Sequence, residues 1–260
     1  MKKEGRKMQE INVRDVQVKS GDDSIFGRLY TPASGDDLPV VIISHGYNGR
    51  HLDWVNEGTF LAEHGIAAFA FDFCGGSMRS ASTGNTTDMT IGTETENLLS
   101  VYAEISSMPF IDPDRVFLMG GSMGGFVSAL AAERLNDKVR ALVLYFPALC
   151  IPDNWRDKYP DDKQIPEVID FWDMEIGKGY VKEVKRIRTF DVLGAYPNPV
   201  LIFHGTEDAV VPISYSQEAA KAYSNARLRV LPGEGHGFSV DAGENVIKEV
   251  LDFVKQNCQP

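Results

Sequence analysis

Short runs of consecutive apolar residues recur along most of the chain, separated by segments with helix-like spacing of apolar residues. Continuous runs rich in β-branched and aromatic residues are typical of strands buried on both faces of a parallel sheet. The predicted strands are Val40–Ile43, Ala67–Phe71, Val116–Met119, Ala141–Tyr145, Val200–Phe203 and Leu228–Leu231. The predicted helices are Trp54–His64, Thr93–Ser107, Gly124–Leu135, Ser216–Tyr223 and Glu244–Lys255. This alternation predicts an α/β fold with a doubly wound, mostly parallel sheet, in which ligands bind at the carboxyl ends of the strands.

Two segments depart from the alternation. Ile11–Val18 and Ile25–Tyr30 flank a polar, glycine-containing turn, which predicts an antiparallel hairpin at the edge of the sheet. The stretch Phe146–Asn198 is rich in proline, aromatic and charged residues, and long connections in compact domains tend to be lids or binding loops. We therefore expect a single domain over residues 1–260, with a cap inserted at about residues 147–198.

A serine lies between glycines directly after one predicted strand. Gly120-Gly121-Ser122-Met123-Gly124 follows Val116–Met119 and opens the next predicted helix. This spacing is typical of the sharp turn that presents a nucleophilic serine, although a glycine-rich turn can also carry an incidental serine. A serine hydroxyl is a weak nucleophile unless a base activates it, so the functional interpretation requires a histidine elsewhere.

His236 is the preferred candidate for that base among the five histidines. It lies in Gly235-His236-Gly237-Phe238 after a predicted strand, where flanking glycines allow a loop to present the imidazole. The other histidines have other expected places: a helix end (His64), an exposed polar loop (His51) and strand ends beneath the site (His45 and His204).

Asp208 is the preferred candidate for the carboxylate that orients the histidine. It follows the predicted strand Val200–Phe203 and gives the chain order serine, acid, histidine. Glu207 competes for the role, and Glu234 has a weaker claim because it shares a short loop with the histidine.

Acyl transfer also needs two N–H groups that stabilise the negative carbonyl oxygen. The first expected donor is the backbone N–H of Met123, the residue after the serine. The second is the backbone N–H of Tyr47, in the loop that follows the predicted strand Val40–Ile43, although that loop also reads as an ordinary glycine-rich turn.

These residues resemble the α/β-hydrolase superfamily and, more narrowly, the small bacterial esterases that include cinnamoyl and feruloyl esterases. The resemblance extends from about Val13 to Val254. One departure is Gly121, where many esterases have histidine; another is the composition of the cap segment. The segments that carry the resemblance, besides the serine motif, are His45-Gly46-Tyr47-Asn48-Gly49, Phe71-Asp72-Phe73-Cys74-Gly75-Gly76-Ser77, Asp88-Met89-Thr90, His204-Gly205-Thr206-Glu207-Asp208 with Val210-Val211-Pro212, and Gly235-His236-Gly237-Phe238.

The resemblance also implies residues that bind substrate. Tyr180 is similar to a cap tyrosine that contacts phenolic substrates in cinnamoyl esterases, and Asp153 to a cap aspartate of the same group. Trp155 and Trp172 are further expected pocket residues, because apolar and aromatic side chains line most small-molecule sites. The alternative for each aromatic is that it only packs the cap onto the core.

The expected activity is that of a serine carboxylic-ester hydrolase of the α/β-hydrolase fold, acting through an acyl-enzyme on short-chain or aromatic esters. Two other hydrolases share these motifs, a prolyl-oligopeptidase-like serine peptidase and an acylglycerol lipase, and a hydrolase fold that binds without turnover is a third alternative. The expected partner is a small-molecule ester, with no metal and no organic cofactor.

The charge balance limits the other partners. The chain has 26 Lys and Arg against 37 Asp and Glu, a formal net charge of -11. An acidic chain is poorly suited to bind nucleic acids or anionic membranes, and no apolar run is long enough to span a bilayer. We expect neither partner, while a homodimer stays open.

The cysteines and the N-terminal residues bear on the compartment. Cys74, Cys150 and Cys258 cannot all pair within one chain and lack metal-ligand spacing, so we expect free thiols, with Cys74 buried. The charged start Met1–Met8 is not followed by an apolar segment and does not resemble a secretory signal. These features predict a cytoplasmic location.

Overall fold

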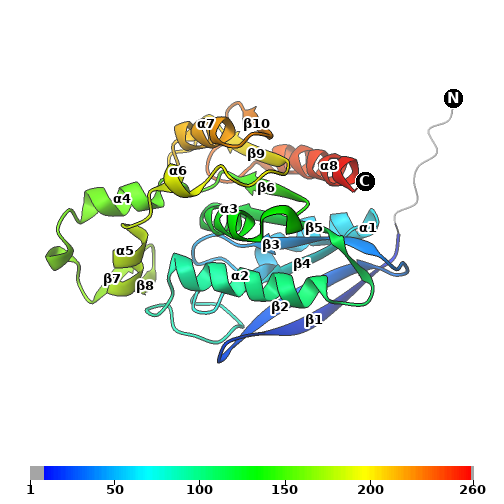
Figure 1. Ribbon diagram of the computed structural model, residues 1–260, viewed down its shortest axis with the longest axis horizontal. Coiled ribbons are helices and arrows are strands. Elements are labelled where there is room, and N and C mark those ends of the chain that lie inside the picture. The colour runs from blue at the N-terminus through cyan, green and yellow to red at the C-terminus, as the bar shows by residue number, and fades with distance from the viewer. Residues whose placement is uncertain (1–8, 259–260) are drawn as a thin grey trace.

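The computed structural model describes residues 9–258; the expectation about a secretory signal falls on residues outside that range. Its main feature is an eight-stranded sheet with the order β1-β2-β4-β3-β5-β6-β9-β10 (Figure 1). β1 and β2 form the antiparallel hairpin, β2 is antiparallel to β4, and the remaining neighbours are parallel. The strands of this sheet are β1 (Ile11–Ser20), β2 (Asp23–Pro32), β3 (Leu38–Ser44), β4 (Ala67–Phe71), β5 (Ile111–Gly121), β6 (Ala141–Tyr145), β9 (Val200–Gly205) and β10 (Ala226–Leu231).

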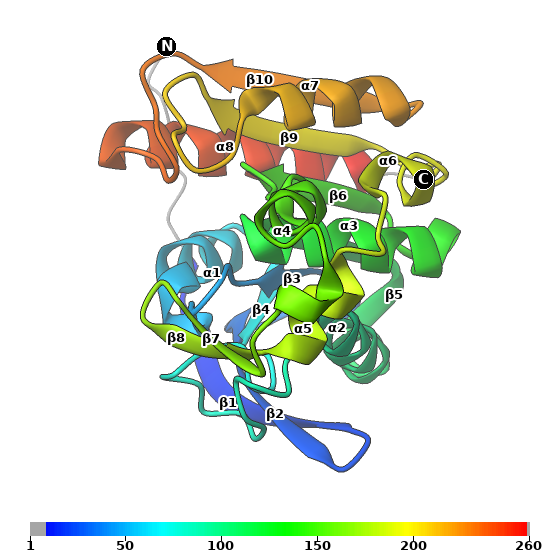
Figure 2. The same ribbon diagram turned by 90° about the vertical axis from the view of Figure 1, so that its left-hand side faces the viewer.

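Helices cover both faces of this sheet, as Figure 2 shows from the side. The buried side chains of α2, α3 and α7 belong to one apolar cluster, and those of α1 and α8 belong to another on the opposite face. The doubly wound, mostly parallel sheet with an N-terminal hairpin is therefore confirmed. These five helices are α1 (Val55–Glu63), α2 (Ile91–Ser106), α3 (Met123–Leu135), α7 (Ile213–Ala222) and α8 (Val240–Asn257).

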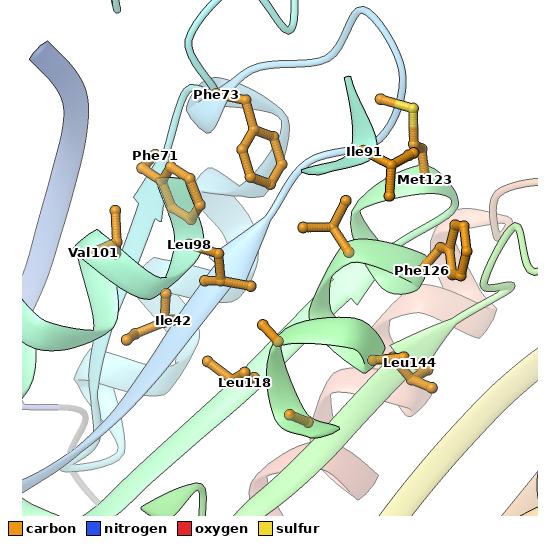
Figure 3. Close-up of a cluster of buried hydrophobic side chains, with 14 of the residues drawn as sticks. Ile42, Phe71, Phe73, Ile91, Leu98, Val101, Leu118, Met123, Phe126 and Leu144 are labelled. Carbon is orange, nitrogen blue, oxygen red and sulfur yellow. The ribbon is translucent and has the colours of Figure 1, made fainter. Parts of the chain in front are cut away.

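Figure 3 shows how one face of the sheet packs. Leu98 of α2 and Phe126 of α3 meet side chains of neighbouring strands, among them Ile42, Leu118 and Leu144. All five side chains are fully buried. Because burial of one such side chain contributes about 1.5–3 kcal/mol, the central strands form a rigid base for the loops at their carboxyl ends.

Four helices, α2, α3, α7 and α8, begin earlier than their apolar spacing predicts, and in two of them a side chain caps the first turn. The hydroxyl of Thr90 caps α2 by accepting a hydrogen bond from the N–H of Thr93 (3.1 Å), and Ser239 caps α8. Because a cap residue satisfies the N–H groups of the first turn, the helix starts at the next residue even where that turn is polar.

The expectation that every predicted strand is buried on both faces is wrong for β10. This strand lies at the edge of the sheet and has only β9 as a neighbour. Its residues are exposed or half-buried, and Val230 is 45 % exposed. Arg229 interrupts the apolar run and is a sign of exposure to solvent, whereas the edge position itself follows only from the order of the strands.

The segment from residue 147 to 198 forms elements that gather on one side of the sheet (Figures 1 and 2). A two-stranded antiparallel hairpin, β7 (Val168–Phe171) and β8 (Met174–Gly177), lies among the short helices α4 (Ile151–Lys158), α5 (Lys178–Val184) and α6 (Thr189–Val192). Short 3-10 turns complete the fold at His51–Trp54, Asn136–Lys138 and Asp162–Gln164. None of the helices within residues 9–258 is long and apolar enough to cross a membrane.

Candidate active site

Ser122 occupies a strained turn between β5 and α3. Its backbone has φ 52° and ψ -123°, a conformation that non-glycine residues rarely adopt and that is common at functional sites. The neighbouring glycines have no room for a side chain: a Cβ on Gly124 would lie 2.2 Å from the carbonyl oxygen of His45, and one on Gly120 would lie 2.3 Å from that of Gly124. Close packing therefore forces the serine motif to be built with glycine.

Gly121 stands where many esterases have histidine, and Trp54 fills the adjacent space. A Cβ on Gly121 would lie 3.1 Å from Cζ2 of the Trp54 indole, which is itself buried. A larger residue at position 121 would displace this indole, so the glycine and the tryptophan compensate for each other.

Three side chains from separate loops form a hydrogen-bonded chain. The Ser122 hydroxyl donates to Nε2 of His236 (2.9 Å), and Nδ1 of His236 donates to Oδ2 of Asp208 (2.8 Å). The aspartate and histidine loops are tied together because the N–H of Glu207 donates to the carbonyl oxygen of Glu234 (2.9 Å). The structure thus brings together the serine, histidine and aspartate that the sequence singles out.

Asp208 is held as a carboxylate. Its Oδ1 accepts hydrogen bonds from the N–H groups of Val210 and Val211, both at 2.8 Å, and its side chain is 1 % exposed. Burial acts to raise the pKa of Asp208, but the bonds from Val211, His236 and Val210 outweigh it and hold the pKa below its ordinary value. A fixed negative charge therefore lies next to the His236 imidazole.

A second imidazole also lies close to Oδ2 of this carboxylate. Nε2 of His204 is 3.2 Å from Oδ2 of Asp208 and donates to the carbonyl oxygen of Val211 (3.0 Å), while the Ser216 hydroxyl donates to its Nδ1 (2.7 Å). Burial lowers the pKa of His204 and favours the neutral ring. This places His204 at a strand end beneath the site, as the sequence predicts.

The competing carboxylates point elsewhere. Glu207 is exposed, and Glu234 accepts from both the N–H and the hydroxyl of Ser239 (2.6 and 2.7 Å) at the start of α8. Asp208 is therefore the carboxylate within hydrogen-bonding distance of His236.

Of the other histidines, one departs from its expected place. His51 is buried, not exposed: its ring Nδ1 and its backbone N–H both lie within 2.8 Å of Oδ1 of Asp72. The polar sequence around His51 conceals this because the partner is distant in the chain. His45 is buried at the end of β3, where Nδ1 donates to the Gly46 carbonyl oxygen (2.7 Å), and His64 bonds the Phe60 carbonyl oxygen at the end of α1 (2.7 Å).

The three cysteines are unpaired, as predicted. Cys74 and Cys150 are buried, and burial raises the pKa of each thiol to about 11, which keeps both protonated. Across residues 9–258, no group of three or more His, Cys, Asp or Glu side chains is arranged to hold a metal ion.

Two backbone N–H groups remain available beside Ser122. Within the described part of the chain, neither the N–H of Met123 nor that of Tyr47 has a protein acceptor. Both residues line the pocket that contains Ser122, and a Cβ on Gly46 would lie 3.8 Å from the serine Oγ. The loop after β3 therefore runs directly past the serine hydroxyl.

The side chain of Tyr47 has a separate structural role. Its hydroxyl donates to the carbonyl oxygens of Phe171 (2.7 Å) and Met174 (3.3 Å) in the turn between β7 and β8. Burial raises the pKa of this hydroxyl and keeps it protonated. The loop beside the serine and the β7–β8 hairpin are therefore coupled through one side chain.

The pocket next to Ser122 has a volume of about 260 Å³. Tyr180, Trp155 and Trp172 line it as expected, with Trp172 at its open end because this side chain is 59 % exposed. Residues that the sequence reasoning did not single out complete the wall: Ala148, Cys150, Ile151, Asn154, Lys158, Phe171, Val210 and Val211.

Asp153 does not reach this pocket. One carboxylate oxygen pairs with Arg156 and the other accepts from the Tyr215 hydroxyl (2.6 Å), and the residue is absent from the lining. The structure therefore gives Asp153 a place in the packing of α4 against α7 rather than the expected contact with substrate.

One helix carries a buried acid that the sequence does not reveal. Glu94 of α2 is completely buried, and neither of its carboxyl oxygens has a hydrogen-bond partner among the described residues. Burial raises the pKa of Glu94 well above its ordinary value, so the folded protein holds the neutral acid. The sequence does not predict this burial, because a buried glutamate in an amphipathic helix is the same residue type as an exposed one.

This acid predicts a pH-dependent loss of stability. At a pH above the pKa that Glu94 has in the unfolded chain, the folded protein keeps the Glu94 proton while the unfolded chain releases it. The free energy of unfolding therefore falls as pH rises. The substitution Glu94→Gln removes this dependence, and its stability relative to the wild type should increase by up to about 1.4 kcal/mol per pH unit. Denaturant unfolding across about pH 5 to 8 measures it. Glu104→Gln, at an exposed position on the same helix, is the control, and its difference in free energy of unfolding from the wild type should stay constant with pH. The same constancy for Glu94→Gln would contradict the prediction.

A serine, a histidine and a buried carboxylate at the carboxyl ends of a parallel sheet define a class: the protein is a hydrolase of the α/β-hydrolase fold. The chain belongs to the prolyl oligopeptidase family, whose family model matches residues 52–260.

Individual relatives agree with this class. The structure of Est1E from Butyrivibrio proteoclasticus with bound ferulic acid is 28 % identical, covers 94 % of this chain and 100 % of its own, and superposes with a TM-score of 0.86. The bifunctional esterase/perhydrolase DCH of Acinetobacter calcoaceticus is 25 % identical over 92 % of this chain and 99 % of its own length. The acylamino-acid-releasing enzyme of Rattus norvegicus is 22 % identical over 84 % of this chain, which matches 31 % of that enzyme.

Proposed function

We propose that the protein is a serine carboxylesterase that acts through a covalent acyl-enzyme. The observation that carries this proposal is the continuous hydrogen-bonded chain from the Ser122 hydroxyl through His236 to Asp208. The two distances, 2.9 and 2.8 Å, allow a proton to pass between the atoms that they join, and the order serine, imidazole, carboxylate is the one that activation of a serine requires.

In the first half of the reaction, Ser122 Oγ attacks the ester carbonyl carbon while His236 Nε2 takes the hydroxyl proton. The carbonyl oxygen becomes negative and is stabilised by the N–H groups of Met123 and Tyr47, which lack protein acceptors in the described structure. The carboxylate of Asp208 stabilises the imidazolium. His236 then gives its proton to the leaving alcohol, and the C–O bond of the ester breaks.

In the second half, water attacks the acyl group on Ser122 and His236 accepts a proton from it. The tetrahedral intermediate collapses, the C–O bond to Ser122 breaks, and the proton returns from His236 to the serine oxygen. The products are a carboxylic acid and a regenerated hydroxyl. The same two N–H groups stabilise the oxyanion in both halves.

The pocket supports a short-chain or aromatic acyl group. A volume of about 260 Å³ lies just below the usual range of sites for drug-sized ligands, and the lining is mainly aromatic and aliphatic. The likeness to a structure with bound ferulic acid supports cinnamoyl or feruloyl esters as candidate substrates. The hydroxyl of Tyr180, which lies 3.5 Å from the Met123 sulfur, supplies a polar group in this wall.

A panel of substrates tests the proposal. We expect hydrolysis of 4-nitrophenyl acetate and butyrate and of methyl ferulate, with lower activity on the octanoate because a small pocket rejects a long chain. An aminoacyl arylamide tests the peptidase alternative, which the family membership favours. None of the described residues that line the pocket is acidic, so no carboxylate is placed there to bind a free amino group. Arylamide cleavage faster than ester hydrolysis would replace our proposal with the peptidase.

A small-molecule ester in the cytoplasm is the setting that we propose for this activity. The unpaired cysteines support a reducing compartment.

A further inference from the structure

One charged side chain stands out in the wall of the Ser122 pocket. Lys158, the last residue of α4, is the only charged residue among the described residues that line it. No carboxylate in the described part of the chain pairs with its ammonium group, although the chain carries far more acidic than basic residues. The lining, which is mainly aromatic and aliphatic, thus carries a positive charge that no described carboxylate pairs with.

Aromatic rings hold this ammonium group against the pocket wall. Nζ of Lys158 lies 4.9 Å from the ring centroid of Trp155, 5.3 Å from that of Phe171 and 5.7 Å from that of Tyr159. Trp155 and Phe171 are themselves pocket residues in mutual contact, with centroids 5.0 Å apart. Each cation–π contact at an exposed site contributes about 0.5–1 kcal/mol, enough to bias the flexible side chain toward the rings.

The ring faces leave the hydrogen-bonding capacity of the lysine unused. An ammonium group has three N–H donors, and no protein acceptor among the described residues takes one from Lys158. A carboxylate is the group that both neutralises this charge and accepts these hydrogen bonds. The net charge of the chain, -11, repels anions at long range, so attraction of an anionic substrate has to come from a local cation such as this one.

We propose that Lys158 binds a carboxylate of the substrate that is remote from the ester bond, so that the preferred substrates are anionic esters. This proposal rests on the proposed ester hydrolysis. The carboxylate belongs either to the acyl group, as in a monoester of a dicarboxylic acid, or to the alcohol. In both cases Ser122 attacks the ester group and Lys158 binds the carboxylate of the same ligand, because both residues line one pocket.

Two matched pairs of substrates show whether the carboxylate that Lys158 binds belongs to the acyl group or to the alcohol. The acyl pair is 4-nitrophenyl hydrogen adipate with 4-nitrophenyl hexanoate, which share chain length and leaving group. The alcohol pair is 4-carboxyphenyl butyrate with phenyl butyrate. For one pair, Lys158→Met should lower kcat/KM for the anionic ester by about threefold to fivefold, mainly through KM, as expected for an ion pair at a partly open site. The neutral ester of that pair should change by less than about twofold.

Two further variants make the test specific. Lys158→Arg keeps the charge and should retain most of the preference for the anionic ester. Lys19→Met removes the same charge from an exposed position on β1 and should leave both ratios unchanged. The quantity compared is the ratio of kcat/KM for the anionic ester to kcat/KM for its neutral partner. If Lys158→Met leaves this ratio unchanged in both pairs, or if Lys19→Met shifts it equally, the assignment of Lys158 is overturned. Absence of Ser122-dependent hydrolysis of the neutral esters would instead overturn the proposed function.

Discussion

Replacement of Ser122 by alanine should abolish ester hydrolysis, with kcat falling by a factor on the order of 10⁴ to 10⁶. The physical reason is that Ser122 lines the pocket and its hydroxyl bonds to His236 Nε2, so the substitution removes the oxygen that forms the acyl-enzyme. Water can still enter the site, and the N–H groups of Met123 and Tyr47 remain. A small residual rate above the uncatalysed reaction is therefore expected.

The measurement is the turnover of 4-nitrophenyl acetate under substrate saturation, together with a thermal unfolding curve. Alanine has the same Cβ as serine and adds no new clash or strain at this positive φ, so the alanine variant should fold as the wild type does. A folded Ser122→Ala protein with nearly normal turnover would exclude Ser122 as the nucleophile.

Replacement of Asp208 by asparagine should lower kcat by about 10⁴-fold near neutral pH while leaving the fold intact. The N–H groups of Val210 and Val211 both donate to Oδ1, so the amide oxygen of asparagine has to occupy that position. The amide NH₂ then faces Nδ1 of His236 and forces the proton of the neutral ring onto Nε2. In that tautomer Nε2 cannot accept the proton of Ser122.

Glu207→Gln is the matched control, because it makes the same charge change at the adjacent, exposed residue. It should leave kcat within about twofold of the wild type, as expected for an exposed charge outside the hydrogen-bonded chain. Equal losses in the two variants would show that charge in this loop matters, rather than the tautomer of His236.

The sequence predicts much of the fold because the central strands lie buried on both faces. Ala67–Phe71 and Ala141–Tyr145 have the predicted bounds, since their apolar runs end where the strands leave the sheet. Helix starts depend on caps such as Ser239, which apolar spacing does not register. The same limit applies to β10, whose edge position is a property of the assembled sheet.

The residues of the candidate site also differ in whether the sequence predicts them. Ser122, Asp208 and His236 could be found because each follows a strand and carries a local turn signature. His51 and Glu94 could not be placed, because their burial depends on elements distant in the chain. Lys158 belongs to the same group: its contact with Trp155 follows from helical spacing, but its contact with Phe171 requires the hairpin to fold back onto α4.

Covalent labelling by a fluorophosphonate shows whether His236 activates the hydroxyl of Ser122, since this reagent reacts with activated serines whatever the natural substrate. Mass spectrometry of the digested protein should find one label, on Ser122, absent from Ser122→Ala and formed far more slowly in Asp208→Asn. A folded wild-type protein that stays unlabelled, or that is labelled at another residue, would rule out activation of Ser122 by His236.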